Sequence, residues 1–308
     1  MNGPVLRIAA QAKLNLHLRV LAREDSGYHS LETIFHRIDL ADDLIIEVTN
    51  GARSISVSGA DLGEPASNLA YRAAAAYSAQ CGWPRGFRIE LVKRIPVGAG
   101  LGGGSADAGA VLRALNSVSP RPLAPAGILA LASSLGSDIP FLASESVMAL
   151  AWGRGERLLS LPPLPRNDVL LLTPPFGVST NDAYRWLDEH RRAQPRSALA
   201  SADTDGVSVE GPEPSLIDAL QLSTWGSIQR IARNDFEAAV AAHHPELMQY
   251  LDRLRNSRAI FAQMTGSGST LFAILDTPPD YGKVPAEHRA KVTTTRTSID
   301  VVQPVRVG

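Results

Sequence analysis

Hydrophobic and polar residues alternate over the first sixty positions of the chain, with the period of β-strands. Leucines at positions 14, 16 and 18 alternate with polar residues, a pattern that predicts a strand with one buried face. The same reasoning predicts further short strands at 44–48, 54–57, 87–92, 146–151, 168–173, 259–262 and 271–275. Strands are therefore expected in both halves of the chain.

Helical patterns stand between these strands. An alanine-rich stretch at 68–80 begins at Asn68, a residue type that caps helices. Further helices are predicted at 105–116, 126–135, 216–231 and 234–255. Because strands and helices are mixed without regular alternation, the pattern favours an α+β fold over a doubly wound parallel sheet.

Two segments suggest how the chain is divided. A proline cluster at 162–165 is the predicted boundary between two domains, residues 1–163 and residues 164–308. The stretch 192–214 is rich in small and polar residues and has no hydrophobic period. We expect a flexible surface insertion there.

Composition restricts the partners. Hydrophobic residues make up 44% of the 308 residues and the formal net charge is −1, which is typical of a globular protein without the basic excess of nucleic-acid binders. A single cysteine, Cys81, excludes an intrachain disulfide. We also find no secretion signal and no apolar run of the roughly 18 residues that a membrane span needs. We expect a cytoplasmic protein, monomer or homodimer, that binds small molecules and neither nucleic acid nor membrane.

The segment 96–105 is the most informative part of the sequence. It has five glycines in seven positions, and a patterned helix follows at once, with Ser105 as its predicted cap. Glycines let the chain bend tightly and expose successive N–H groups, and a helix N-terminus adds a positive dipole. This combination is typical of a phosphate-binding site.

Two known glycine patterns fit this segment incompletely. Gly98, Gly100 and Gly103 have the spacing of dinucleotide-binding folds, but Pro96 interrupts the strand before them and no acidic residue follows at the required distance. The P-loop pattern needs a lysine where Gly104 stands. The cation that meets the phosphates must therefore come from elsewhere in the chain.

Three segments in order resemble the motifs of the GHMP kinases, named for galacto-, homoserine, mevalonate and phosphomevalonate kinases. They are residues 12–16, 96–105 and 264–270. The resemblance implies a two-lobed α+β fold, with an N-terminal ATP-binding lobe like domain 2 of ribosomal protein S5 and a ferredoxin-like C-terminal lobe. It also implies ATP as co-substrate and Mg²⁺ as cofactor.

Residues 23–33, 136–141 and 153–156 are similar to segments of one branch of this family. In that branch the γ-phosphoryl group of ATP passes to the 2-hydroxyl of diphosphocytidyl methylerythritol, an isoprenoid precursor of the non-mevalonate pathway. The alternatives are another kinase of the family, acting on homoserine, mevalonate or a sugar, a decarboxylase on the same fold, or a nucleotide sensor without activity.

The resemblance also implies roles for single residues. Lys13 and Asp138 would be catalytic, although Lys13 also fits a surface charge on a strand and Asp138 an ordinary turn residue. ATP would bind to Pro96, Val97, Gly98, Ala99, Gly100, Leu101, Gly102, Gly103, Gly104 and Ser105, and Ser105 would also contact Mg²⁺ through the phosphates. The substrate would bind to Asn15, Tyr28, His29, Tyr184, Gly266, Ser267, Gly268 and Ser269. For Asp107 we expect only a favourable interaction with the helix dipole.

Overall fold

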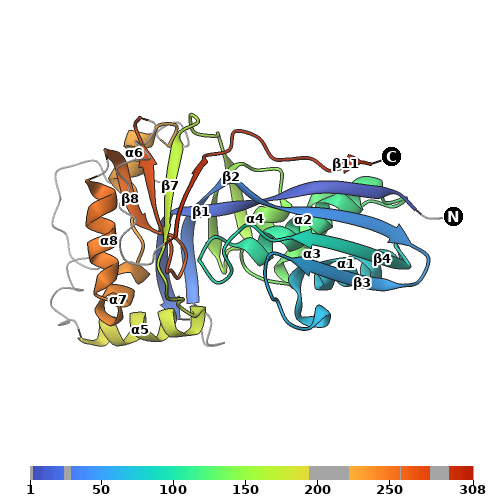
Figure 1. Ribbon diagram of the computed structural model, residues 1–308, viewed down its shortest axis with the longest axis horizontal. Helices are drawn as coiled ribbons and strands as arrows, with labels where there is room; N and C mark the ends of the chain where they lie inside the picture. The colour runs from blue at the N-terminus through green and yellow to red at the C-terminus, as the bar shows by residue number, and fades with distance from the viewer. Residues whose placement is uncertain (1–2, 24–28, 194–221, 257, 278–290, 308) are drawn as a thin grey trace, which may run out of the picture.

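The computed structural model describes residues 3–23, 29–193, 222–256, 258–277 and 291–307 (Figure 1). The strands are β1 (Val5–Arg23), β2 (His29–Thr49), β3 (Arg53–Ser58), β4 (Gly86–Val92), β5 (Met148–Gly153), β6 (Arg157–Leu161), β7 (Asp168–Thr173), β8 (Ala259–Met264), β9 (Leu271–Leu275), β10 (Lys291–Arg296) and β11 (Val305–Arg306). The helices are η1 (Pro65–Ser67), α1 (Leu69–Cys81), α2 (Gly103–Val118), α3 (Pro125–Ser133), α4 (Ile139–Ala143), α5 (Thr180–Ala193), α6 (Trp225–Ile231), α7 (Phe236–His243) and α8 (Glu246–Arg255).

The larger sheet has the order β11-β1-β2-β4-β3, and β5 and β6 extend it from β2. Its long antiparallel strands β1 and β2 reach from the right-hand part of the molecule into the left-hand part (Figure 1). Leu14 and Leu16 of β1 share a hydrophobic core with Val111 and Leu112 of α2. The helix that follows the glycine loop therefore packs directly on the central strand.

The smaller sheet is antiparallel, with the order β10-β7-β9-β8. Helices α5, α7 and α8 lie beside it at the left of Figure 1. A second core forms here, in which Leu247 and Leu251 of α8 join Leu170 of β7 and Met264 of β8. The mixed α+β fold expected from the sequence is confirmed. The boundary at 163/164 falls between β6 of the larger sheet and β7 of the smaller sheet, and the division into two domains stays a prediction.

Three sequence-based expectations about the elements were wrong in detail. β1 is buried on both faces rather than one, since Asn15 and His17 are each only 3% exposed. The His17 ring lies against the end of α6, with Nδ1 2.6 Å from Ile231 O. The helix expected at 234–255 is two helices, because Pro245 interrupts it. The helix after the glycine loop starts at Gly103 with Gly102 as its cap, so Ser105 lies inside the first turn and does not cap it.

The helix expected at 216–231 is helical only at Trp225–Ile231, and its part up to residue 221 lies outside the described residues. The remaining predicted elements agree with the structure, and α1 begins after Asn68, whose side chain accepts a hydrogen bond from Ala70 N. Helices α4 and α5 and strands β6, β10 and β11 were not anticipated. The insertion expected at 192–214 lies outside the described residues from residue 194 onward. Among the described residues, no helix is long and apolar enough to cross a membrane.

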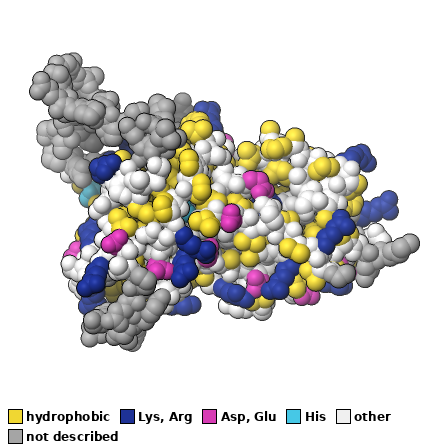
Figure 2. Space-filling model, turned by 90° about the horizontal axis from the view of Figure 1, so that it is seen from above, with side chains coloured by type: hydrophobic (Ala, Val, Ile, Leu, Met, Phe, Trp, Pro, Cys, Tyr) yellow, Lys and Arg dark blue, Asp and Glu magenta, His cyan; other side chains and the backbone are white. Residues whose placement is uncertain are grey.

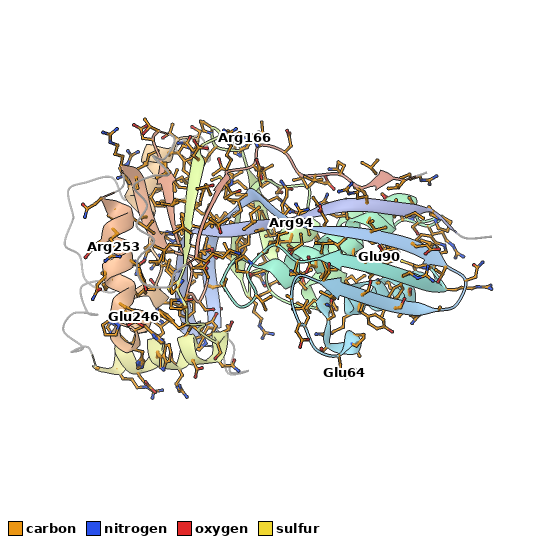
Figure 3. All side chains as sticks on the ribbon, in the orientation of Figure 1. Glu64, Glu90, Arg94, Arg166, Glu246 and Arg253 are labelled. Atoms are coloured by element: carbon orange, nitrogen blue, oxygen red, sulfur yellow. The ribbon has the colours of Figure 1, made fainter. Side chains whose placement is uncertain are left out.

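Charged side chains on the surface are mixed in sign. On the face shown in Figure 2, lysines and arginines are interspersed with aspartates and glutamates. Figure 3 shows Glu64 near η1, and Glu246 and Arg253 along α8, at the edge of the molecule.

Candidate functional site

The glycine-rich segment forms the loop that joins β4 to α2. Gly98, Gly100 and Gly102 have φ angles of +69°, +74° and +69°, a left-handed conformation that glycine adopts without steric cost. A Cβ atom at Gly100 would lie 2.2 Å from the backbone oxygen of Thr265. The glycine loop and a second glycine turn, residues 265–269 between β8 and β9, therefore touch backbone to backbone. Helix α2 presents its N-terminus directly behind the loop.

Residues distant in sequence hold the second glycine turn against β1. Asn15 N donates to Thr265 Oγ1 at 3.1 Å. Asn234 Nδ2, from the segment before α7, donates to Met264 O at 2.8 Å and to Gly266 O at 2.9 Å. Sequence reasoning missed Asn234, because nothing near it in the chain indicates that it supports a turn thirty residues away.

Lys13 points from β1 toward the loop. Its side chain is almost fully buried, and Nζ donates to Asn15 Oδ1 at 2.6 Å and to Gly100 O at 2.9 Å. The same nitrogen lies 3.3 Å from Asp138 Oδ2 and 5.6 Å from the centre of the Phe35 ring. The structure thus brings the two predicted catalytic residues together beside the glycine loop.

Asp138 is the N-cap residue of the five-residue helix α4, and its carboxylate is 30% exposed. The other end of α4 is held by Arg37, a buried residue of β2 that pairs with Lys13 across the sheet. Its guanidinium donates to Phe141 O, Leu142 O and Ser144 O at 2.9–3.1 Å. Burial lowers the pKa of Arg37 to about 9, so the guanidinium keeps its charge near neutral pH.

Lys13, Asp138 and the glycine loop line one cavity of about 570 Å³. The predicted residues that line it are Lys13, Asn15, Pro96, Val97, Gly98, Ala99, Gly100, Gly102, Gly103, Gly104, Ser105, Asp138, Tyr184, Gly266, Ser267 and Gly268. Leu101 and Ser269 are not among the lining residues. Leu101 is buried in the core, and the Ser269 hydroxyl donates to the backbone oxygen of Phe176 at 2.5 Å.

A larger groove of about 1370 Å³ shares Tyr184 with this cavity and is also lined by His29. The rings of His29 and Tyr184 are stacked, 4.7 Å apart at 17°, and His29 Nε2 lies 3.4 Å from Asp188 Oδ1. Burial, and secondarily the charge of Asp138, raises the pKa of Tyr184 to about 12, so its hydroxyl stays protonated. Tyr28 lies outside the described residues.

A second lysine, which sequence reasoning missed, lies at the same cavity. Lys93 Nζ forms ion pairs with Asp42 and with Asp107, the latter at 2.7 Å. Burial raises the pKa of Asp107 to about 7, and Lys93 opposes this shift. Asp107 of α2 is thus the partner of a buried lysine, whereas the sequence suggested only an interaction with the helix dipole. A signal existed, because this arginine-rich chain has only four lysines and Lys93 directly precedes the loop.

The side chains present do not form a metal site by themselves. No cluster of three or more His, Cys, Asp or Glu residues suited to a metal occurs within the described part of the chain. The Ser105 hydroxyl does line the cavity, and Mg²⁺ is commonly bound by nucleotide phosphates with one or two protein oxygens and water. The site therefore fits an Mg²⁺ ion that arrives with a nucleotide, and it does not fit one held by protein alone.

Comparison with known proteins identifies the family. Residues 68–145 match the family model of the GHMP kinases N terminal domain, and residues 216–292 match that of the GHMP kinases C terminal domain. The 4-diphosphocytidyl-2-C-methyl-D-erythritol kinase of Pelotomaculum thermopropionicum is 38% identical, over 95% of this chain and 98% of that protein. The enzyme of the same name from Moorella thermoacetica is 39% identical, over 88% and 90%.

Solved structures agree with these relatives. A crystal structure of 4-(cytidine 5'-diphospho)-2C-methyl-D-erythritol kinase has a TM-score of 0.69 and 34% identity, covering 95% of this chain and 99% of that one. Homoserine kinase from Cytophaga hutchinsonii also has a TM-score of 0.69, covering 99% and 98%, but only 17% identity, so it shows the fold alone. The chain therefore belongs to the GHMP kinases, in the family of the 4-diphosphocytidyl-2-C-methyl-D-erythritol kinases.

Proposed function

We propose that this protein transfers the γ-phosphoryl group of ATP to the 2-hydroxyl of 4-diphosphocytidyl-2-C-methyl-D-erythritol, a step of the non-mevalonate route to isoprenoid precursors. The observation that carries the proposal is the 3.3 Å pair of Lys13 and Asp138. This pair lies between a glycine loop suited to phosphates and a groove with stacked aromatic rings. The family relatives, which carry this substrate in their names, support it.

ATP would bind with its phosphates on the glycine loop. The loop N–H groups and the N-terminus of α2 provide hydrogen-bond donors and positive potential for the phosphates. Lys13 adds a cation beside the middle of the loop, since its Nζ donates a hydrogen bond to Gly100 O. Mg²⁺ bound with ATP would supply further positive charge at the phosphates, with the Ser105 hydroxyl as a protein contact.

Asp138 would face the acceptor hydroxyl. Its side chain lines the cavity, with Oδ2 3.3 Å from the ammonium of Lys13. An ionised carboxylate can orient the hydroxyl or accept its proton, and Lys13 can stabilise the negative charge that develops on the transferring group. Because phosphoryl transfer depends mainly on positioning and electrostatics, these two residues suffice for the protein's part of the chemistry.

The cytidine part of the substrate would lie in the groove beside Tyr184. An aromatic ring offers a stacking surface for a base, and we expect His29 and Tyr28 to contact the cytosine. The turn formed by Gly266, Ser267, Gly268 and Ser269 would meet the substrate diphosphate, with Ser269 contributing only its backbone because its hydroxyl is already bonded. Asn15 would contact the substrate next to Lys13.

The proposal is tested by ADP release from ATP with a panel of alcohols: the diphosphocytidyl methylerythritol, homoserine, mevalonate and galactose. We expect kcat/KM for the cytidine compound to exceed the others by at least about 10²-fold, because a base-binding groove adds interactions that small alcohols lack. Faster turnover of homoserine, mevalonate or galactose would contradict the assignment. Nucleotide binding without ADP release for any of these alcohols would favour the alternative that the protein is a nucleotide sensor without activity. The cytoplasmic location and the monomer or homodimer state stay predictions.

A further inference from the structure

We infer that Lys93, held between Asp42 and Asp107, is a positioning residue that fixes both ends of the glycine loop in the conformation that binds the nucleotide. The inference rests on the proposed placement of ATP at that loop. It concerns a residue to which neither the sequence motifs nor the proposed catalytic pair assigns a role.

The three charged side chains form a buried cluster between separate elements. Lys93 follows the end of β4, Asp42 belongs to β2, and Asp107 belongs to α2. Their side chains are 4%, 0% and 2% exposed. The single ammonium group thus bridges a strand of the larger sheet and the helix that follows the loop.

Asp42 extends the cluster to the backbone that enters the loop. While its Oδ2 accepts from Lys93, its Oδ1 accepts from the backbone N–H groups of Arg94 and Ile95, the latter at 2.9 Å. Asp107, at the other end, is part of the second turn of α2. The residues immediately before the loop and the helix immediately after it are therefore both tied to the Lys93 ammonium.

The loop needs such fixation more than an ordinary turn does. Three of its glycines have left-handed φ angles, and glycine loses more conformational entropy on ordering than any other residue. A ligand that must order a mobile loop binds more weakly, whereas a preordered loop saves that entropy. Fixing the two ends before ATP arrives therefore raises the affinity for the nucleotide through the conformation of the loop.

The position of Lys93 supports a positioning role rather than a direct one. Its Nζ would lie 3.3 Å from a Cβ atom built at Gly103, so it lies directly against the first turn of α2. Its ammonium is already bonded to the carboxyl groups of two residues, whereas Lys13 faces a single one. Stability alone does not require these charges, because apolar residues in place of a buried ion cluster are often as stable or more so.

The decisive experiment measures the dissociation constant of Mg²⁺–ADP by calorimetry, together with KM for the alcohol, in Lys93→Met. We expect the nucleotide dissociation constant to rise about 10–100-fold, as for loss of a buried charged group at a binding site. KM for the alcohol should stay within about threefold. Leu251→Ala is the control, because it creates a cavity in the core of the smaller sheet. At a temperature where all variants are folded, it should bind Mg²⁺–ADP with the same affinity as the unmodified chain.

An unchanged nucleotide affinity in folded Lys93→Met would overturn the inference, and so would an equal loss of affinity in Leu251→Ala. If Lys93→Met does not fold, Asp107→Asn provides the same test, because it keeps the size of the side chain and removes one charge partner of Lys93. We expect a smaller rise of about 3–10-fold in that variant, and no rise would overturn the inference. No binding by the unmodified chain would overturn the proposed function as well.

Discussion

At the scale of single residues, Lys13 and Asp138 have opposite surroundings. The lysine is buried and bonded to Asn15 and Gly100, whereas the aspartate is partly open to the cavity. This difference suits a fixed cation beside a carboxylate that must meet a substrate. The ion pair also joins β1 to α4, so a variant at either position tests chemistry only if the protein still folds and still binds ATP.

We predict that Lys13→Ala and Asp138→Asn each lower kcat by about 10²–10⁴-fold. Each change removes charge next to the reacting groups, and Asp138→Asn keeps the size of the side chain. ADP release under saturating ATP measures the effect, and circular dichroism checks the fold. A folded variant with nearly unmodified turnover would remove that residue from the proposed mechanism.

Tyr184 gives a second test at the same scale. Removing its ring in Tyr184→Ala should raise KM for the cytidine substrate about 5–150-fold, because base–aromatic stacking contributes about 1–3 kcal/mol per base. Tyr184→Phe keeps the ring and should keep KM within about threefold. Equal KM values for the alanine variant and the unmodified chain would contradict a stacking role.

At the scale of elements, α4 has five residues, and so short a helix is not stable in isolation. Arg37 compensates for this, because its guanidinium satisfies the carbonyl groups at the C-terminal end of α4. The N-terminal end of the same helix carries Asp138. The position of Asp138 at one end of α4 thus depends on the hydrogen bonds that Arg37 makes at the other end.

We predict that Arg37→Met lowers the free energy of unfolding by about 3 kcal/mol, because buried carbonyl groups would lose their charged donor. Urea unfolding followed by circular dichroism measures the change. Arg88→Met is the matched control, since Arg88 is 55% exposed and forms a surface ion pair with Glu47, which contributes at most about 1 kcal/mol. Similar losses in the two variants would refute the capping role of Arg37.

At the scale of the whole molecule, the two parts meet over buried polar residues. His36 of β2 is fully buried, and its ring lies 5.7 Å from the ring of Trp225 in α6. Its Nδ1 lies 2.7 Å from the backbone oxygen of Arg37. Burial lowers the pKa of His36 from 6.5 to about 4. Desolvation also lowers the pKa of His17. Both rings resist protonation in the folded state.

We predict that His36 contributes a loss of stability on acidification below pH 6.5, while Asp107, whose pKa is raised by burial to about 7, contributes with the opposite sign. Between pH 6.5 and about 4 the unfolded chain binds a proton at His36 that the folded chain does not, so the free energy of unfolding falls as the pH falls. The share of His36 is about 2 kcal/mol at pH 5 relative to pH 7. Urea titrations at several pH values measure it. Between pH 7 and pH 5 the unmodified chain should lose about 2 kcal/mol more than His36→Leu, and equal pH dependence in the two proteins would contradict the assignment.

Much of the candidate site could be predicted from local patterns and motifs. The glycine loop, its following helix and the second glycine turn are local features, so their positions followed from residue types and spacing. Lys93, Asn234 and Arg37 could not be found in this way. Their partners lie in other elements, so the pattern around each residue does not show the bonds that it makes across the fold. Only for Lys93 was there a signal, the scarcity of lysine and the position just before the loop.

The amino-acid sequence by itself determined the strand and helix periods, the turns that require glycine and the kinase family, because these depend on neighbouring residues and on motifs read in order. Only the tertiary structure decided that both faces of β1 are buried, where α2 begins, and that Lys13 reaches Asp138. Burial and long-range distances arise when elements pack together, and packing is a property of the whole chain. For the same reason only the fold shows Lys93 as the buried link between the two ends of the glycine loop.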